Sequence, residues 1–221
     1  MIVDHVVTGM FMENCFLVAC EETHEGIIID PGDEAERIAE MVERHHVTPV
    51  QVINTHAHID HVGAVAEICR RYGIPFAVHE GEKENLDSLA SHASVFGLSA
   101  PEQPEVGAWI QYGQVFTFGN ATLTAIATPG HTPGGVSFHG VSANGDEFVI
   151  AGDTLFQRSI GRTDLPGGDF PTLQASIREN LFALPPDTVV HCGHGPSTTI
   201  GQEKADNPFV GDGANPALFG F

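Results

Sequence analysis

The sequence predicts a mixed α/β protein in which two packed β-sheets are flanked by helices. Strand-like apolar runs fall into two groups, at residues 2–54 and 115–191, and each group contains an amphipathic helical segment. In both groups a strand leads into a loop that contains histidine. Strands that follow one another in runs form sheets, and each sheet needs one covered face. A chain of 221 residues, 42% of them hydrophobic, is long enough to bury such a core.

The first group of elements alternates strands with helices. Pro31 and Gly32 end an apolar run, and Ala35, Ile38 and Val42 then recur at helical spacing. A second set of apolar residues at helical spacing begins at Val62 and is ended by a glycine and a proline. The expected elements are strands at 2–8, 15–20, 26–30 and 50–54 and helices at 33–46 and 62–72.

The second group consists of short strands separated by glycine-rich turns, followed by one helix. Leu173, Ile177 and Leu181 share one face of a helix that begins at Phe170. Between the two groups, residues 82–104 mix short helical patterns with proline and glycine, so we expect irregular covering structure there. The expected strands are 115–118, 121–128, 136–139, 148–151 and 188–191.

Composition and charge exclude several classes of function. The net charge of −20 repels phosphate backbones and anionic lipids, which argues against a nucleic-acid partner and a membrane partner. No stretch approaches the roughly 20 apolar residues of a membrane span, and the first residues lack the basic start of an export signal. The four cysteines form no paired pattern, so we expect a protein of the reducing cytoplasm.

The expected domain organisation is one domain at residues 1–206 followed by a C-terminal tail at 207–221. The tail contains two Asn-Pro pairs and several phenylalanines, and its pattern leaves open whether it docks or frays. The oligomeric state also stays open at this level.

The segment at residues 55–61 places four candidate metal ligands between the end of a strand and the start of a helix. In extended backbone, residues two apart point the same way, so His56 and His58 can bind one ion. Asp60 and His61 come where the chain turns into the helix and therefore face a second, neighbouring ion. Packing so many ionisable groups beside apolar strands costs several kcal/mol unless a cation compensates them. We therefore interpret the segment as metal-binding.

Three further candidate ligands each follow a predicted strand within a glycine-rich turn. They are His131, Asp153 and His194. Loops at strand ends gather at one edge of a sheet, and flanking glycines let the backbone approach an ion closely. Their shared position indicates that they complete the metal site.

Together these motifs resemble the metallo-β-lactamase superfamily over nearly the whole chain. They are H-x-H-x-D-H at residues 56–61, G-H-T-P-G around His131, G-D-T around Asp153 and G-H-G around His194. The resemblance implies a four-layer αββα sandwich of the metallo-β-lactamase type. Asp30 lies in a turn similar to an early turn of the family, in which the aspartate supports the site from behind. The sequence after Asp153 is similar to the single-domain, glyoxalase II-like (hydroxyacylglutathione hydrolase-like) branch.

The resemblance also implies how the ligands are shared between two divalent ions. His56, His58 and His131 are expected to bind one ion, and the other is expected to be bound by Asp60, His61 and His194. Asp153 is expected to bridge them. The donor set favours zinc and also permits iron or manganese.

These ligands imply a metal-dependent hydrolase. A divalent ion lowers the pKa of its bound water to roughly 7, so a bridging hydroxide attacks the substrate, and Asp60 orients that attack. No spare general acid is evident in the sequence, which suits a thiolate leaving group with a pKa of about 8–9 better than an amide nitrogen. The expected substrate is a small acyl-thiol, the thioester of a hydroxyacyl-thiol conjugate such as an S-lactoyl-thiol.

Arg158 and Arg162 are the candidate substrate contacts. They follow Asp153 in a glycine-rich loop, and basic residues are scarce in this chain, so these two suit a substrate carboxylate. A surface salt bridge is the alternative for each. Asp164, Asp169 and Cys192 have more ordinary structural explanations and stay outside the expected site.

Two other functions stay open. A persulfide dioxygenase shares these motifs but uses one iron and consumes oxygen, and the sequence alone does not separate it from the hydrolase. The second is a non-catalytic, metal-stabilised binding protein. Structural zinc sites close their shell with four protein ligands, whereas the expected set leaves room for water at each ion, which favours catalysis.

Overall fold

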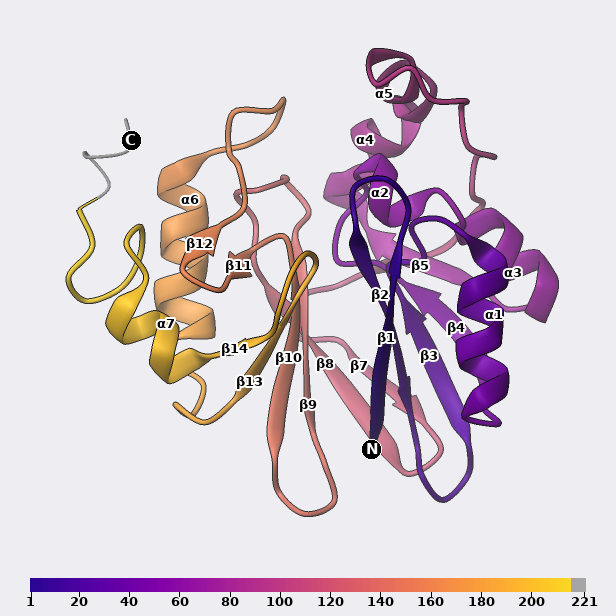
Figure 1. The fold of residues 1–221 in the computed structure, drawn as a ribbon, viewed down its shortest axis with the longest axis horizontal. Coiled ribbons are helices and arrows are strands. Elements are labelled where there is room, and N and C mark those ends of the chain that lie inside the picture. Colours follow the sequence, from indigo (N-terminus) through magenta and orange to yellow (C-terminus); the bar gives the residue numbers. More distant parts are fainter. Residues whose placement is uncertain (216–221) are drawn as a thin grey trace. The chain divides into compact units, whose positions relative to one another are not determined.

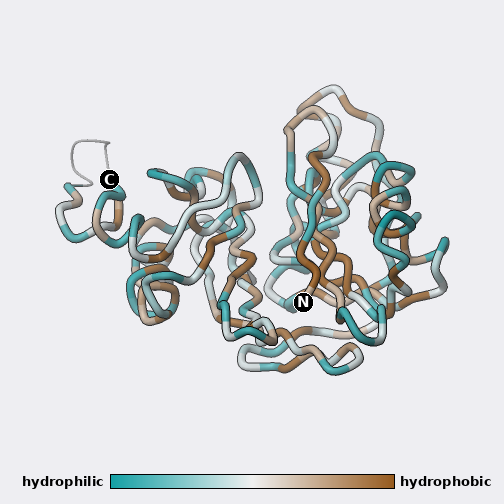
Figure 2. Tube along the Cα trace, turned by 60° about the horizontal axis from the view of Figure 1, so that its bottom comes forward, coloured by the Kyte–Doolittle hydropathy of each residue, from teal (hydrophilic) through white to brown (hydrophobic). Residues whose placement is uncertain are grey.

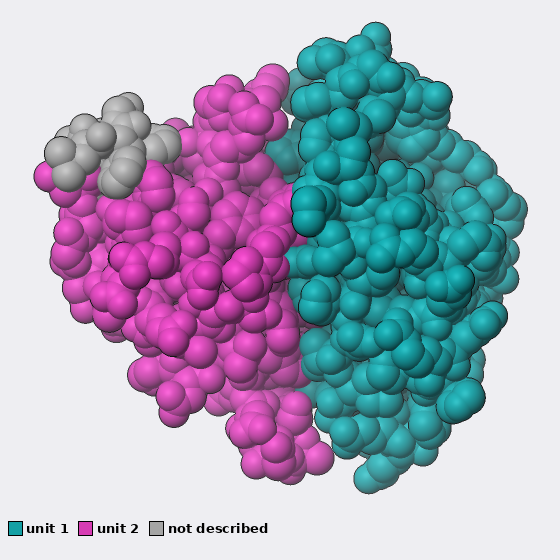
Figure 3. Space-filling view, viewed as in Figure 1, with its two compact units in different colours: residues 1–111, 116–122 teal, residues 112–115, 123–221 magenta. Residues whose placement is uncertain are grey.

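The computed structural model describes residues 1–215, and within it the chain forms two compact units (Figures 1 and 3). Unit 1 consists of Met1–Gln111 and Phe116–Thr122, and unit 2 consists of Tyr112–Val115 and the chain from Leu123 on. The last part of the predicted tail, residues 216–221, lies outside the described residues. Across residues 1–215, none of the helices has the length and apolar character needed to cross a bilayer.

The sheet of unit 1 has its strands in sequential order. β1 and β2 form an antiparallel hairpin, β2 pairs antiparallel with β3, and β3 to β6 run parallel. The strands of this sheet are β1 (Ile2–Thr8), β2 (Glu13–Ala19), β3 (Glu25–Ile29), β4 (Thr48–Ile53), β5 (Phe76–His79) and β6 (Val106–Ile110). The four strands predicted for this part of the chain are confirmed, whereas β5 and β6 were not predicted. Both are short, and β5 has no polar alternation because three of its four residues are buried.

Helices connect the parallel strands of unit 1. They are α1 (Ala35–Arg44), α2 (Ile59–Val62), α3 (Val65–Tyr72), the short 3₁₀ turn η1 (Glu80–Glu82), α4 (Lys83–Asp87) and α5 (Leu89–Val95). Apolar faces of α1 and α3 and the buried side of the sheet form one hydrophobic core, in which Leu17, Ile38 and Ile68 are fully buried. In Figure 2 the hydrophobic stretches of this unit run along its strands.

Two predictions for these helices were wrong in detail. The helix expected at 62–72 begins three residues later, as α3, and Val62 instead ends the short helix α2, with Gly63 between them. A Cβ atom at Gly63 would lie 2.3 Å from the Gly32 carbonyl oxygen, so the backbone packs too closely there for any side chain. The irregular structure expected at 82–104 is partly helical, because Leu86, Leu89 and Ala93 bury themselves in the core.

The second sheet has the order β14-β13-β10-β9-β8-β7. Its β8–β9, β9–β10 and β13–β14 pairs are antiparallel, and its β10–β13 pair is parallel. Its strands are β7 (Val115–Phe118), β8 (Ala121–Ala127), β9 (Val136–Val141), β10 (Glu147–Gly152), β13 (Val189–Cys192) and β14 (Thr198–Thr199). A separate two-stranded hairpin consists of β11 (Leu155–Phe156) and β12 (Ser159–Ile160). The five strands predicted for this half are confirmed, and β11, β12 and β14, each two residues long, are additional.

Unit 2 has its own core and covers it with helices. The predicted helix from Phe170 is present as α6 (Phe170–Ala175), continued by a π-helical turn, η2 (Ser176–Leu181). Leu173, Ile177 and Leu181 are fully buried, as their spacing predicts. A further helix, α7 (Ile200–Asp206), precedes the tail, whose first residue, Asn207, is buried and donates hydrogen bonds to Ser159 and Glu203. The start of the tail is therefore docked on unit 2.

Candidate metal centre

The histidine segment of unit 1 is shaped by a buried asparagine at the end of β4. The Asn54 side-chain amide donates hydrogen bonds to the His61 carbonyl at 2.6 Å and to the His56 carbonyl at 3.3 Å. These bonds fold residues 55–61 back on themselves, so that α2 begins directly after His58. The turn is further fixed by Gly32, where a Cβ atom would lie 1.7 Å from the Asp60 carbonyl oxygen.

This turn brings the unit 1 candidate ligands together. The ring centroid of His56 lies 4.8 Å from that of His58 and 4.1 Å from that of His61. His56 and His61 are buried, whereas Asp60 retains a side-chain exposure of 19%. Its Oδ2 atom lies 3.9 Å from Nε2 of His61.

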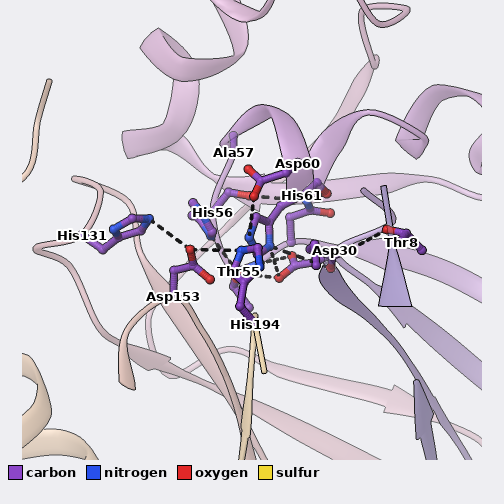
Figure 4. A network of polar contacts seen from close by, with 12 residues as sticks. Thr8, Asp30, Thr55, His56, Ala57, Asp60, His61, His131, Asp153 and His194 are labelled. Carbon is purple, nitrogen blue, oxygen red and sulfur yellow. Dashed lines mark hydrogen bonds and ion pairs between the residues drawn. The ribbon is translucent and has the colours of Figure 1, made fainter. Parts of the chain in front are cut away.

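Two of these imidazoles are held through their Nδ1 atoms (Figure 4). Asp30 Oδ2 lies 3.1 Å from Nδ1 of His61, and the Thr55 hydroxyl lies 3.0 Å from Nδ1 of His56. Thr55 in turn donates from its amide and its hydroxyl to the two oxygens of Asp30, at 2.7 and 2.6 Å. An imidazole that donates from Nδ1 presents the lone pair of Nε2, which is how histidine binds a metal. Asp30 thus lies where the resemblance placed it, behind the ligands.

Two further buried carboxylates of unit 1 were not identified from the sequence. Glu82 is fully buried, and its Oε2 atom accepts hydrogen bonds from the Ala57 amide and the Asn85 side chain, both at 2.9 Å. Glu13 is also fully buried and accepts a hydrogen bond from Thr8 at 2.8 Å. Burial raises the pKa of Glu13 well above its usual value. An acidic residue just before the apolar run at 15–20 was the available signal for Glu13, whereas nothing in its neighbourhood singles out Glu82.

The three candidate ligands of unit 2 converge on one carboxylate. Asp153 follows β10, and its Oδ2 atom lies 3.7 Å from Nε2 of His131 and 3.5 Å from Nε2 of His194. Nδ1 of His131 lies 2.7 Å from the Arg162 carbonyl oxygen, so this ring also presents Nε2. Gly161 packs against Asp153, since a Cβ atom there would lie 1.8 Å from the Asp153 carbonyl oxygen. The loop of β11 and β12 therefore supports both Asp153 and His131.

The donor atoms of each unit suit a divalent metal ion. Two atoms bound tetrahedrally to one zinc at 2.0–2.1 Å lie roughly 3.4 Å apart, and a direct hydrogen bond is shorter, at about 2.7–3.2 Å. The separations of 3.5, 3.7 and 3.9 Å between imidazole nitrogens and carboxylate oxygens are closer to the spacing of two zinc ligands than to a hydrogen bond. Nitrogen and oxygen donors of this kind bind zinc, iron or manganese.

The two candidate substrate arginines are exposed residues of the loop after Asp153. The Arg162 guanidinium forms two hydrogen bonds to Asp164, at 2.7 and 2.8 Å, and this pairing lowers the pKa of Asp164 to about 2. Arg158 has a positive φ of 57°, and its amide donates to the buried carboxylate of Glu203.

Two residues that the sequence analysis left outside the site have structural roles. Asp169 caps the start of α6 by accepting a hydrogen bond from the Thr172 amide. Cys192 is 1% exposed, and burial raises the pKa of its thiol to about 12.

Comparison with known proteins identifies the family. Residues 8–194 match the model of the metallo-beta-lactamase superfamily. Hydroxyacylglutathione hydrolase GloC from Haemophilus influenzae is 38% identical over 202 residues, which cover 90% of this chain and 93% of that protein.

Two solved structures extend the likeness to the fold. The B3 metallo-beta-lactamase BLEG-1 is 36% identical with a TM-score of 0.85, over 95% of this chain and 99% of that one. TTHA1623, solved in a di-iron-bound form, is 38% identical with a TM-score of 0.81, over 94% of this chain and all of that one. These likenesses confirm the predicted metallo-β-lactamase-type fold. The chain belongs to the metallo-beta-lactamase superfamily.

Proposed function

We propose that this protein is a metal-dependent thioesterase that hydrolyses hydroxyacyl-thiol conjugates of the S-lactoyl-thiol kind. The observation that carries the proposal is the position of Asp153 Oδ2 at 3.5 and 3.7 Å from two imidazole nitrogens, because a carboxylate between two ligands suits a pair of ions. The 38% identity to hydroxyacylglutathione hydrolase GloC supports the choice of substrate class.

The proposed ligand set is the one that the sequence motifs predicted. His56, His58 and His131 would hold one ion. Asp60, His61 and His194 would hold the other, and Asp153 would be shared between the two. The ions are zinc in this proposal, with iron and manganese as chemically suitable substitutes.

The chemistry is hydrolysis of a thioester. When bound, the divalent ions supply a polarising charge for the thioester carbonyl and lower the pKa of a water to roughly 7. Asp60 accepts a hydrogen bond from the attacking water and so directs its oxygen at the carbonyl carbon. One proton of the water passes to Asp60, the carbon–sulfur bond breaks, the thiol departs as a thiolate and the acyl group becomes a carboxylic acid. A thiol pKa of about 8–9 lets this group leave without prior protonation.

We also propose that Arg158 and Arg162 bind the anionic part of the thiol carrier. Both side chains are exposed, and planar guanidinium groups pair well with carboxylates. Arg162 would exchange its present partner, Asp164, for the substrate. The acidic composition supports a small-molecule partner rather than nucleic acid or a membrane surface. All four cysteines are free thiols, which supports a cytoplasmic location.

The test is release of free thiol from S-lactoylglutathione and from S-lactoyl-N-acetylcysteamine. We expect turnover by the purified protein, its loss on chelation, its return on addition of Zn²⁺, and its loss in Asp60→Ala. Asp187→Ala is the matched control, because Asp187 is an exposed carboxylate in unit 2 and outside the proposed ligand set. Metal binding without turnover of either thioester would instead support the non-catalytic binding protein.

The second candidate is the persulfide dioxygenase, which uses one iron. The likeness to a protein solved in a di-iron-bound form supports iron as the metal and does not distinguish one ion from two. Oxygen uptake with glutathione persulfide, measured on iron-loaded protein, tests it. Thiol release from a thioester without oxygen uptake supports the hydrolase, whereas oxygen uptake without thioester hydrolysis supports the dioxygenase.

A further inference from the structure

Unit 1 contains a cavity of about 390 Å³ beside α2. Its walls come from four segments, which are the β1–β2 hairpin tip at residues 8–11, the turn at 32–33, residues 59–60 with Gly63, and residues 98–101. The volume falls in the range of about 300–1,000 Å³ typical of small-molecule sites. It is also several times larger than a lactoyl group requires.

The cavity borders the unit 1 candidate ligands. Asp60 lines it, and Oδ2 of the same residue lies 3.9 Å from Nε2 of His61. A molecule in the cavity therefore lies within reach of the carboxylate that we propose to direct the attacking water.

Much of the wall is apolar. The cavity is lined by Met10, Phe11, Ile59 and Leu98. Met10 is 65% exposed, and exposed apolar surface of this kind often marks a binding site. An edge-to-face contact between Phe11 and Phe96, with ring centroids 5.1 Å apart, ties the hairpin tip to the chain just before residues 98–101. The two walls are thus held together by side-chain packing.

The charge of the cavity favours an uncharged occupant. Neither lysine nor arginine is present among its described lining residues, and its two carboxylates are Asp33 and Asp60, of which Asp60 is a proposed metal ligand. The nearby Arg37 guanidinium is already bound by Glu34 and by the Val7 carbonyl. The wall therefore offers no cationic side chain to pair with the carboxylates and phosphates of common thiol carriers. The acyl half of a thioester carries no charge before hydrolysis.

We infer that this cavity binds the acyl group of the substrate and prefers uncharged, apolar 2-hydroxyacyl chains longer than lactoyl. The inference rests on the proposed thioesterase function and deepens it by naming the acyl class. Each methylene that the apolar wall removes from water raises kcat/KM by up to about fourfold.

The test compares thioesters of one neutral thiol, N-acetylcysteamine, that carry lactoyl, 2-hydroxybutanoyl and 2-hydroxyhexanoyl groups. We expect kcat/KM to rise along the series by about fourfold for the first added methylene and by tenfold or more overall. Ala100→Phe fills the cavity from its rim and should abolish the preference for the longer chain, so that kcat/KM no longer rises along the series. Val95→Phe is the matched control, because Val95 is 79% exposed and does not line the cavity.

The outcomes separate this inference from the function on which it rests. If no thioester in the series is hydrolysed, the proposed function fails. If lactoyl thioesters are hydrolysed but chain length has no effect, or Ala100→Phe acts no differently from Val95→Phe, the acyl assignment is overturned. A second series keeps the lactoyl group and lengthens an alkyl thiol. If Ala100→Phe changes kcat/KM only along this second series, the cavity binds the thiol half and the acyl assignment is overturned.

Discussion

Glu82 provides a sharp test of how unit 1 shapes its candidate ligands. Its carboxylate is fully buried and accepts a hydrogen bond from the amide of Ala57, the residue between His56 and His58. It also accepts from Asn85, so Glu82 joins the helical segment after β5 to the histidine turn. Glu82→Ala removes both bonds, whereas Glu82→Gln removes the charge and keeps one oxygen to accept from Ala57.

The expected loss in the free energy of unfolding follows from these two hydrogen bonds. Hydrogen bonds to charged groups contribute about 1.5–3 kcal/mol each, and part of that gain is offset because a buried carboxylate is itself costly to desolvate. We expect Glu82→Ala to lower the free energy of unfolding by about 3 kcal/mol and Glu82→Gln by about 1 kcal/mol. Groups that orient metal ligands typically change metal affinity by 10–100-fold, and we expect about tenfold weaker zinc binding for Glu82→Gln.

The assays are urea unfolding of the metal-free protein and competitive zinc titration against a chromogenic chelator. Glu80→Gln is the matched control, since Glu80 lies in the same 3₁₀ turn and is exposed. It should leave both quantities unchanged. The reasoning is refuted if Glu82→Gln binds zinc as tightly as Glu80→Gln, or if Glu82→Ala unfolds at the urea concentration of the unsubstituted protein.

Three further predictions concern thiol chemistry, packing and substrate charge. The Thr23 side chain and backbone lower the pKa of Cys20 to about 7, and burial raises that of Cys192 to about 12. Because the thiolate is the reactive form, iodoacetamide should label Cys20 with a midpoint near pH 7, slowly because this side chain is 4% exposed, and leave Cys192 unlabelled at pH 8, as peptide mapping by mass spectrometry would show. Gly32→Ala would place a Cβ atom 1.7 Å from the Asp60 carbonyl oxygen, so it should destabilise the protein in thermal unfolding by about 2–3 kcal/mol, whereas Gly213→Ala, which meets nothing within 4 Å, should not. Arg158→Ala should raise KM severalfold for S-lactoylglutathione and leave KM for S-lactoyl-N-acetylcysteamine unchanged; equal effects on both thioesters would show that Arg158 does not read the carrier's charge.

The sequence was informative about those parts of the candidate site whose residues lie close together along the chain. The spacing of His56, His58 and His61 is a local feature, and the structure places these three rings close together in unit 1. In unit 2 it places His194 beside Asp153. Asp30 is a similar case, since its turn follows directly on a strand.

What the sequence did not reveal depends on packing between segments far apart in the chain. Glu82 meets Ala57 only because β5 pairs beside β4, and the acidic stretch around Glu82 looks like any solvated one. The strands β5 and β6 are short and lie in a parallel part of the sheet, where the alternation that marks exposed strands is weak. The cavity beside Asp60 likewise arises where the hairpin tip meets residues 98–101.

Metal content is the most direct test of the proposed two-ion centre, measured by elemental analysis of the purified protein and of Asp153→Asn together with thioesterase activity. We expect two divalent ions per chain, and the loss of at least one ion and of nearly all activity in Asp153→Asn. A metal-free protein that hydrolyses S-lactoylglutathione at full rate, or an Asp153→Asn variant that keeps both ions and its activity, would contradict this expectation.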